Sequence, residues 1–201
     1  MKNNKPQDLM SLLQNEYLKR KDVYDTGFNP TYPQIVDENG ISTIDFDNLT
    51  EEQKEDLKLD QLFVAENKLR ADTFNKFLKI SEGYTSELDI PEVASEDDYK
   101  IVNDRLNNRP GCIMGDFIKE TTKRYDDSLS TTYTFYADIF GEHVELPDDI
   151  ETKSVEEQLE VLKKLYMDTL LKRGYSQDEI LNACYSFAEN TFGRKEQEMG
   201  R

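Results

Sequence analysis

The chain has 201 residues, a formal net charge of −17 and a single histidine. So negative a chain argues against direct binding to nucleic acid or to anionic membranes, and it favours a partner with a basic protein surface. Aromatic residues, all of them Tyr or Phe, make up 10% of the chain. This favours a folded protein, because disordered chains lack the apolar side chains that offset the entropy lost on ordering.

Signals for export or for membrane insertion are missing from the sequence. No apolar run is long enough to span a bilayer, and the first ten residues, MKNNKPQDLM, lack the apolar centre of a signal peptide. Cys112 and Cys184 are too few for a disulfide framework and indicate a reducing compartment. We therefore expect a cytoplasmic protein, located in the host cytoplasm if the gene is phage-borne, with no membrane contact.

Residues 1–49 predict an N-terminal helix followed by an extended arm. Apolar residues at positions 9, 12, 13 and 17 share one face of a helix that runs from about Pro6 to Lys21. The following stretch is irregular, but Asn39 and Gly40 stand between two short apolar runs. This dipeptide is typical of a two-residue hairpin turn, so we expect a hairpin in the arm.

A long helix is predicted from Thr50 to about Gly83. The sequence TEEQ at 50–53 has the pattern of a capping box, in which two side chains pair with free backbone N–H groups at the start of the helix. A continuous helix of this length would measure about 45 Å at 1.5 Å per residue. Because this is long for a domain of this size, we expect a break near Asp60 or Asp72.

The middle of the chain predicts two shorter helices and a segment of mixed character. Ser95 to Asp98 marks a helix N-terminus, and a turn at 107–111 leads to a further helix from about Ile113 to Tyr125. Residues 130–146 fit both the alternation of a strand and the spacing of a helix. The enrichment in Thr and aromatic residues favours the strand.

The C-terminal third predicts two helices joined by a very short turn. Capping boxes begin at Ser154 and Ser176, and Gly174 ends the first of these helices. The expected fold is therefore mainly α, or α+β with a small β-hairpin or strand element. We expect the helical domain, a helical bundle with a C-terminal αα-hairpin, to span 50–193 and to precede a flexible tail at 194–201.

The histidine and the acidic residues raise the question of a metal site. His143 follows Glu142 directly, whereas zinc sites combine several nitrogen or sulfur ligands at fixed spacing. Residues 37–48 resemble an EF-hand loop in length, but Ile41 and Asn48 stand at the fifth and twelfth positions, where calcium needs oxygen ligands and a bidentate Glu. A hairpin explains this stretch better. We predict no metal and no cofactor.

Motifs of catalysis are also missing. The sequence has no GxxxxGK[ST] phosphate loop, no GxGxxG and no GxSxG nucleophile motif. Carboxylates are too abundant for any pair of them to indicate an active site. We therefore predict a protein with no catalytic residues, and a metal-dependent enzyme stays the third alternative.

The negative charge is concentrated in three stretches, 22–53, 80–99 and 125–152. Together they hold 23 of the 42 acidic residues and no Lys or Arg. These stretches are either solvated connectors or parts of one negative face for a basic partner. In the second case we expect the partner to contact carboxylates of the second and third stretches: Glu87, Asp89, Glu92, Glu96, Asp97, Asp98, Asp126, Asp127, Glu142, Glu145, Asp148 and Asp149.

These features predict a protein–protein interaction protein. Its most specific form is an inhibitor of the phage or mobile-element, anti-defence type, which mimics nucleic acid by presenting carboxylates where phosphates would sit on a nucleic-acid enzyme. The alternative is a structural subunit of a large assembly, such as a phage virion or a portal-associated component. Sequence leaves the oligomeric state open. Electrostatic binding should weaken steeply with salt, whereas an assembly held by apolar contacts should not.

Overall fold

The computed structural model describes residues 8–21, 32–84, 88–114, 117–125 and 128–193. The predicted helix start at Pro6 and the predicted tail at 194–201 lie outside these ranges. The described helices are α1 (Leu9–Lys21), α2 (Glu51–Leu78), α3 (Glu96–Asn108), α4 (Val155–Lys172) and α5 (Gln177–Phe192). The described strands are β1 (Gln34–Val36), β2 (Ser42–Ile44), β3 (Phe117–Tyr125), β4 (Ser128–Ile139) and β5 (Glu142–Glu145).

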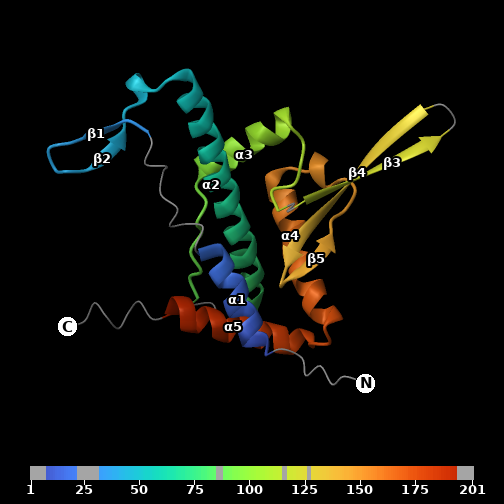
Figure 1. Ribbon diagram of the computed structural model, residues 1–201. Helices are drawn as coiled ribbons and strands as arrows, with labels where there is room; N and C mark the ends of the chain where they lie inside the picture. Colours follow the sequence, from blue (N-terminus) through green and yellow to red (C-terminus); the bar gives the residue numbers. More distant parts are fainter. Residues whose placement is uncertain (1–7, 22–31, 85–87, 115–116, 126–127, 194–201) are drawn as a thin grey trace, which may run out of the picture.

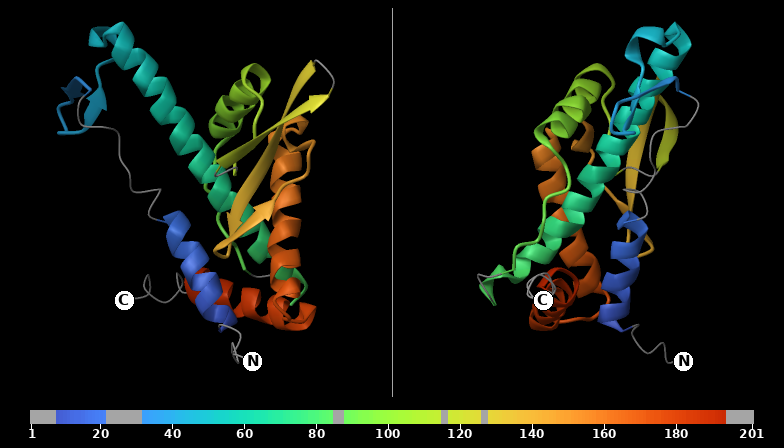
Figure 2. Two further views of the ribbon diagram at one scale, coloured as in Figure 1. Left: turned by 45° about the vertical axis from the view of Figure 1, so that its right-hand side comes forward. Right: turned by 90° about the vertical axis from the view of Figure 1, so that its left-hand side faces the viewer.

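The elements form a helical body from which two hairpins project (Figure 1). Strands β1 and β2 make an antiparallel pair beside the N-terminal end of α2, and β3, β4 and β5 make an antiparallel sheet in that order. The long β3–β4 hairpin extends away from the body on the other side of α2, and α5 crosses the foot of α2 and α4 (Figures 1 and 2). Fold class is as predicted, mainly α with a small β element.

The hairpin predicted in the arm is confirmed. Gly40 adopts φ +79°, a conformation that favours glycine, in the turn between β1 and β2. The Asp37 carboxylate accepts hydrogen bonds from the backbone N–H groups of Asn39 at 2.9 Å and Ile41 at 2.8 Å. Asp37 therefore shapes the hairpin turn, which supports the hairpin over the calcium loop.

The strand prediction for 130–146 is confirmed, but the helix predicted from Ile113 to Tyr125 is wrong. Residues 117–125 form β3, which pairs with β4 along its whole length, from Phe117 opposite Tyr136 to Tyr125 opposite Ser128. Local apolar spacing suggested a helix, but β4 offers a long strand rich in Thr and aromatic residues as a partner. Pairing across the two strands outweighs the weak local helix signal.

The predicted break in the long helix is also wrong, since α2 runs without interruption from Glu51 to Leu78. Its second half is buried in the body, while its first half projects beyond the body and carries the β1–β2 hairpin (Figure 2). A helix that extends out of the domain is not limited by the diameter of the domain. At its start the Thr50 hydroxyl accepts from Gln53 N–H and the Gln53 amide oxygen accepts from Thr50 N–H, as the capping box predicted.

The capping boxes predicted at Ser154 and Ser176 are present too. Residues 173–176 join α4 to α5, and Gly174 at φ +95° ends the first helix. The connection is as short as predicted, but α5 turns steeply away and crosses the foot of α4 instead of lying back along it (Figures 1 and 2).

The core of the body is aromatic at its centre. Tyr166 of α4 stacks on Phe77 of α2 at 5.4 Å between ring centroids, and Phe140, which follows β4, meets Tyr166 edge-on at 5.3 Å. Helix α1 adds apolar side chains to this same core, including the fully buried Leu13. A separate small cluster of Tyr32, Leu49 and Leu57, with Ile44 packed against it, joins the β1–β2 hairpin to α2.

Gln158 of α4 is a buried polar side chain that connects three parts of the body. Its amide oxygen accepts from Ile113 N–H at 3.0 Å, and its amide nitrogen donates to the carbonyl oxygens of Gly111 at 3.1 Å and Ile150 at 3.0 Å. Residues 111–113 are thereby fixed to α4 just before the chain enters β3. Gln158 lies on the apolar face of α4 and is fully buried.

Replacement of this side chain should be costly. We expect Gln158→Met, which keeps the size but removes the amide, to lower the free energy of unfolding by about 2–4 kcal/mol, because it leaves buried backbone groups unpaired. Chemical denaturation measures the change. The exposed Gln177→Met is the control and should change stability by less than about 0.5 kcal/mol. Equal effects of the two substitutions would contradict the role given to Gln158.

Candidate functional site

The one histidine does not sit in a metal-binding cluster. His143 lies on β5, exposed and opposite Asp138 of β4 in the sheet register. Within the described part of the chain, no group of three or more His, Cys, Asp or Glu side chains is placed to hold a metal ion. Cys112 and Cys184 are both buried, and burial raises the pKa of the Cys184 thiol to about 12.

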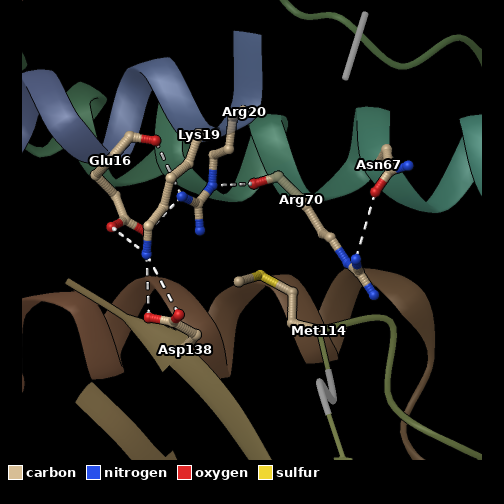
Figure 3. Close-up of a pocket in the computed structure, with 7 residues that line it drawn as sticks. All are labelled: Glu16, Lys19, Arg20, Asn67, Arg70, Met114 and Asp138. Carbon is tan, nitrogen blue, oxygen red and sulfur yellow. Dashed lines mark hydrogen bonds and ion pairs between the residues drawn. The ribbon is translucent and has the colours of Figure 1, made fainter. Parts of the chain in front are cut away.

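A pocket of about 270 Å³ opens between α1, α2 and β4 (Figure 3). Lys19 reaches from α1 to β4 and donates to both carboxylate oxygens of Asp138 at 3.3 Å (Figure 3). Arg70 donates to the carbonyl oxygen of Ile113 at 2.7 Å and to the amide oxygen of Asn67 at 3.3 Å. The pocket is lined by Glu16, Lys19, Arg20, Asn67, Arg70, Met114 and Asp138.

A buried ionic network lies at the base of this pocket. The guanidinium of Arg20 donates to the Glu16 carboxylate and to the Tyr166 hydroxyl, and its Nε donates to the carbonyl oxygen of Arg70 at 3.1 Å. The second Glu16 oxygen accepts from Phe140 N–H at 3.2 Å. Burial raises the pKa of Tyr166, so the hydroxyl stays protonated and donates in turn to Glu16 at 3.3 Å.

The polar groups of this pocket connect secondary-structure elements to one another. Glu16 and Arg20 come from α1, and their partners belong to α2, α4 and the end of β4. The charged groups of the pocket bind one another or backbone carbonyls, so the arrangement holds α1 in place. Sequence reasoning missed it because Glu16 and Arg20, four residues apart, look like an exposed ion pair on a helix surface.

The acidic residues predicted as partner contacts fall into two groups, and Glu87, Asp126 and Asp127 lie outside the described residues. The first group is on and before α3, and we call it the α3 acidic surface: Asp89, Glu92, Glu96 and Asp97. The second group is on and after β5, and we call it the β5 acidic surface: Glu142, Glu145, Asp148 and Asp149. Figure 1 and the right-hand view of Figure 2 place the segment before α3 and strand β5 on opposite sides of α2.

Some of these carboxylates already have partners within the protein. Glu142 pairs with Arg173 at 2.5 Å, Asp149 pairs with Lys153 at 2.7 Å, and Glu92 lies 3.8 Å from Lys79. The hydrogen bond from Lys153 lowers the pKa of the Asp149 carboxyl. Among the described residues, the exposed carboxylates with no cation within ion-pair distance are Asp89, Glu96, Asp97, Glu145 and Asp148 of these two surfaces.

Asp98 has a structural role. It is 6% exposed, it accepts from the backbone N–H of Ser95 at 2.7 Å to complete the capping box of α3, and it binds Lys68 of α2 at 3.1 Å. Burial opposes ionisation, but the hydrogen bonds from Ser95 and Lys68 outweigh it, so the pKa of Asp98 is lowered. Its carboxylate fixes α3 to α2 and is not offered to a partner.

No contact residue was predicted in the first acidic stretch, but its described part lies on the projecting β1–β2 hairpin and at the start of α2 (Figure 1). Because the predicted arm within residues 1–49 continues into the projecting half of α2, we redefine the arm as residues 32–63, which comprise β1, β2 and the first half of α2. The arm carries nine carboxylates and two lysines, a net charge of −7. The block of acidic residues without Lys or Arg was visible in the sequence, but the projection of α2 that places residues 32–53 away from the body was not.

Within the described residues, no helix combines the length and the apolar character needed to cross a bilayer. Comparison of the chain with protein-family models, with curated proteins and with solved structures finds no match.

Removal of the Asp98 charge should alter how stability depends on pH. Because its folded pKa is lowered, Asp98 contributes stability above its unfolded pKa of about 3.9 and loses it as the pH falls through the folded value. We expect Asp98→Asn to be less stable than the native chain near pH 6, and the difference in unfolding free energy to shrink as the solution is acidified toward about pH 2. A difference that does not change with pH would contradict the role of the charge.

Disruption of the buried network should be more severe. Glu16→Gln leaves the buried Arg20 guanidinium without its counter-ion, and we expect a loss of about 3–5 kcal/mol in unfolding free energy. Glu55→Gln, which alters an exposed pair with Lys58 at 4.0 Å, is the control and should cost less than about 1 kcal/mol. A loss below 1 kcal/mol for Glu16→Gln would show that the network does not hold α1.

Proposed function

We propose that this chain is a non-enzymatic acidic protein that binds the basic, nucleic-acid-binding surface of another protein and inhibits it. The observation that carries the proposal is the set of exposed carboxylates that have no counter-ion among the described residues. Asp97 and Glu96 belong to the first turn of α3, and Glu145 and Asp148 lie on or next to β5. Glu96 and Asp97 on a helix and Glu145 on a strand are held in place, as an imitation of regularly spaced phosphates requires.

The net charge of the chain also supports a basic protein surface as the partner. A net charge of −17 attracts a basic surface over several ångströms and repels nucleic acid itself. In this proposal the chain competes with nucleic acid for the basic surface of the partner. In this proposal the chain belongs to the phage or mobile-element type of anti-defence inhibitor and acts in the host cytoplasm.

A structural subunit of a large assembly is the second candidate, because the two hairpins project from the body. The β3–β4 hairpin carries Leu129 and Tyr133, which are 72% and 53% exposed. Such side chains on a projecting hairpin could pack on neighbouring subunits of a particle. Contacts of this kind would be apolar and would survive high salt.

Charge reversal on the α3 acidic surface tests the proposal. The tagged chain should capture a nucleic-acid enzyme from nuclease-treated lysate at low salt, release it at high salt and inhibit the purified enzyme. We expect Asp97→Lys to weaken inhibition about tenfold or more, as the loss of one favourable pair and the gain of one repulsion imply. Asp148→Lys provides the same test for the β5 acidic surface.

Asp178→Lys is the matched control, because Asp178 is exposed and is the second residue of α5, just as Asp97 is the second residue of α3. Both substitutions place a cation at a helix N-terminus, so a general effect on helix stability should appear in both. Equal inhibition by native chain, Asp97→Lys and Asp148→Lys would refute the proposal. Salt-resistant recovery of this chain with itself or with particle proteins would favour the structural subunit.

A further inference from the structure

The arm exposes apolar side chains far more than the body does. Six of the eleven large apolar side chains that are exposed among the described residues belong to it, and each is between 52% and 63% exposed: Ile35, Val36, Ile41, Phe46, Leu59 and Phe63. The small cluster around Tyr32 and Leu57 packs only the inner side of the hairpin against α2. The remaining apolar area of the arm has no cover from the described chain.

Part of this exposed apolar area lies along one face of α2. Positions 52, 56, 59 and 63 follow helical spacing, so Glu52, Asp56, Leu59 and Phe63 lie in one row, which we call the arm face. The same row continues into the body. There Glu66 pairs with Arg105 of α3, and Arg70 binds the carbonyl oxygen of Ile113.

The continuation into the body shows what kind of contact this row makes. Where α3 lies against the row, it supplies an arginine to a carboxylate of α2. Toward the N-terminal end of α2, α3 no longer covers the row, and Leu59 and Phe63 are 60% and 57% exposed. The row thus presents two apolar side chains one turn apart, Leu59 and Phe63, and beyond them, toward the start of α2, the carboxylates of Glu52 and Asp56. This pattern complements a helix that carries apolar residues at the same spacing with Lys or Arg beside them.

We propose that the arm face docks a basic amphipathic helix of the partner protein. This proposal rests on the proposed function, which calls for a basic partner, and it names the part of that partner which the arm receives. A second copy of the chain is a poor occupant, because the arm carries a net charge of −7 and would repel another arm. Apolar contact with Leu59 and Phe63 would add affinity that does not depend on salt.

A synthetic peptide tests the arm face without knowledge of the partner. The probe is a fluorescent Leu/Lys peptide of roughly five helical turns with one apolar face, and its binding to the full chain is followed by anisotropy. A scrambled peptide of the same composition and a Leu/Glu peptide with the same apolar face serve as comparisons. We expect the Leu/Lys peptide to bind about tenfold or more tightly than either.

The paired substitution Leu59→Gln with Phe63→Gln should weaken binding of the Leu/Lys peptide about tenfold. Both positions are exposed, so the fold should be kept, and circular dichroism with thermal unfolding checks this. The control pair is Leu129→Gln with Leu171→Gln, which alters exposed leucines outside the arm and should leave binding unchanged. Equal effects of the two pairs, or no effect of the first, would overturn the proposal.

Two further outcomes separate this proposal from others. Concentration-dependent self-association that is lost in the Leu59/Phe63 variant, with no peptide binding, would overturn it in favour of a second copy of the chain. Failure of the proposed function is seen separately, because Asp97→Lys and Asp148→Lys test enzyme inhibition away from the arm. Peptide binding that depends on Leu59 and Phe63 would stand even if those reversals left inhibition unchanged.

Discussion

The buried Arg20 guanidinium is the constraint on which the arrangement of the body depends. It joins α1 to the Tyr166 hydroxyl of α4 and to the backbone of α2, while its counter-ion Glu16 binds the backbone after β4. A buried ion pair contributes little net stability because both charges lose their water. It does, however, make any other position of α1 costly, because a displaced helix would leave a charge and several hydrogen-bonding groups unpaired.

The continuity of α2 connects this rigid body to the arm. In its buried half the helix contributes Phe74 and Phe77 to the aromatic core. In its projecting half Leu57 joins the small cluster beside the hairpin, and Asp60 accepts a hydrogen bond from the Tyr32 hydroxyl at 2.8 Å. A single uninterrupted helix keeps the arm in a defined direction, although the apolar cluster that attaches the hairpin is small. The same helix thus serves as core in one half and as exposed surface in the other.

The local signals of helix capping and of the hairpin turn were read correctly from the sequence, whereas structure that depends on distant pairings was not. The capping boxes and the Asn39-Gly40 turn each depend on residues a few positions apart, so their chemistry is complete in the sequence. Strand β3 depends on β4, and Gln158 depends on carbonyl groups at residues 111 and 150, so neither could be recognised from neighbouring residues. Glu16 and Arg20 were missed for the same reason, since only burial distinguishes them from an ordinary surface pair.

The acidic composition suggests a larger surface for a partner than the fold leaves available, because many carboxylates form hydrogen bonds or ion pairs within the fold. Glu157 and Glu179 complete capping boxes, and hydrogen bonds from the Ser154 and Ser176 backbone lower their pKa values. Asp98 completes the capping box of α3, and its pKa is lowered as well. A carboxylate that is already paired gains little from a new cation, since it must first give up its present partner. The carboxylates that can attract a basic surface are therefore those that the fold leaves without counter-ions, and these include residues at the start of α3, beside β5 and along the arm. Among the described residues, the arm places such carboxylates in one row with the uncovered side chains of Leu59 and Phe63, so it offers a partner both charge and apolar contact.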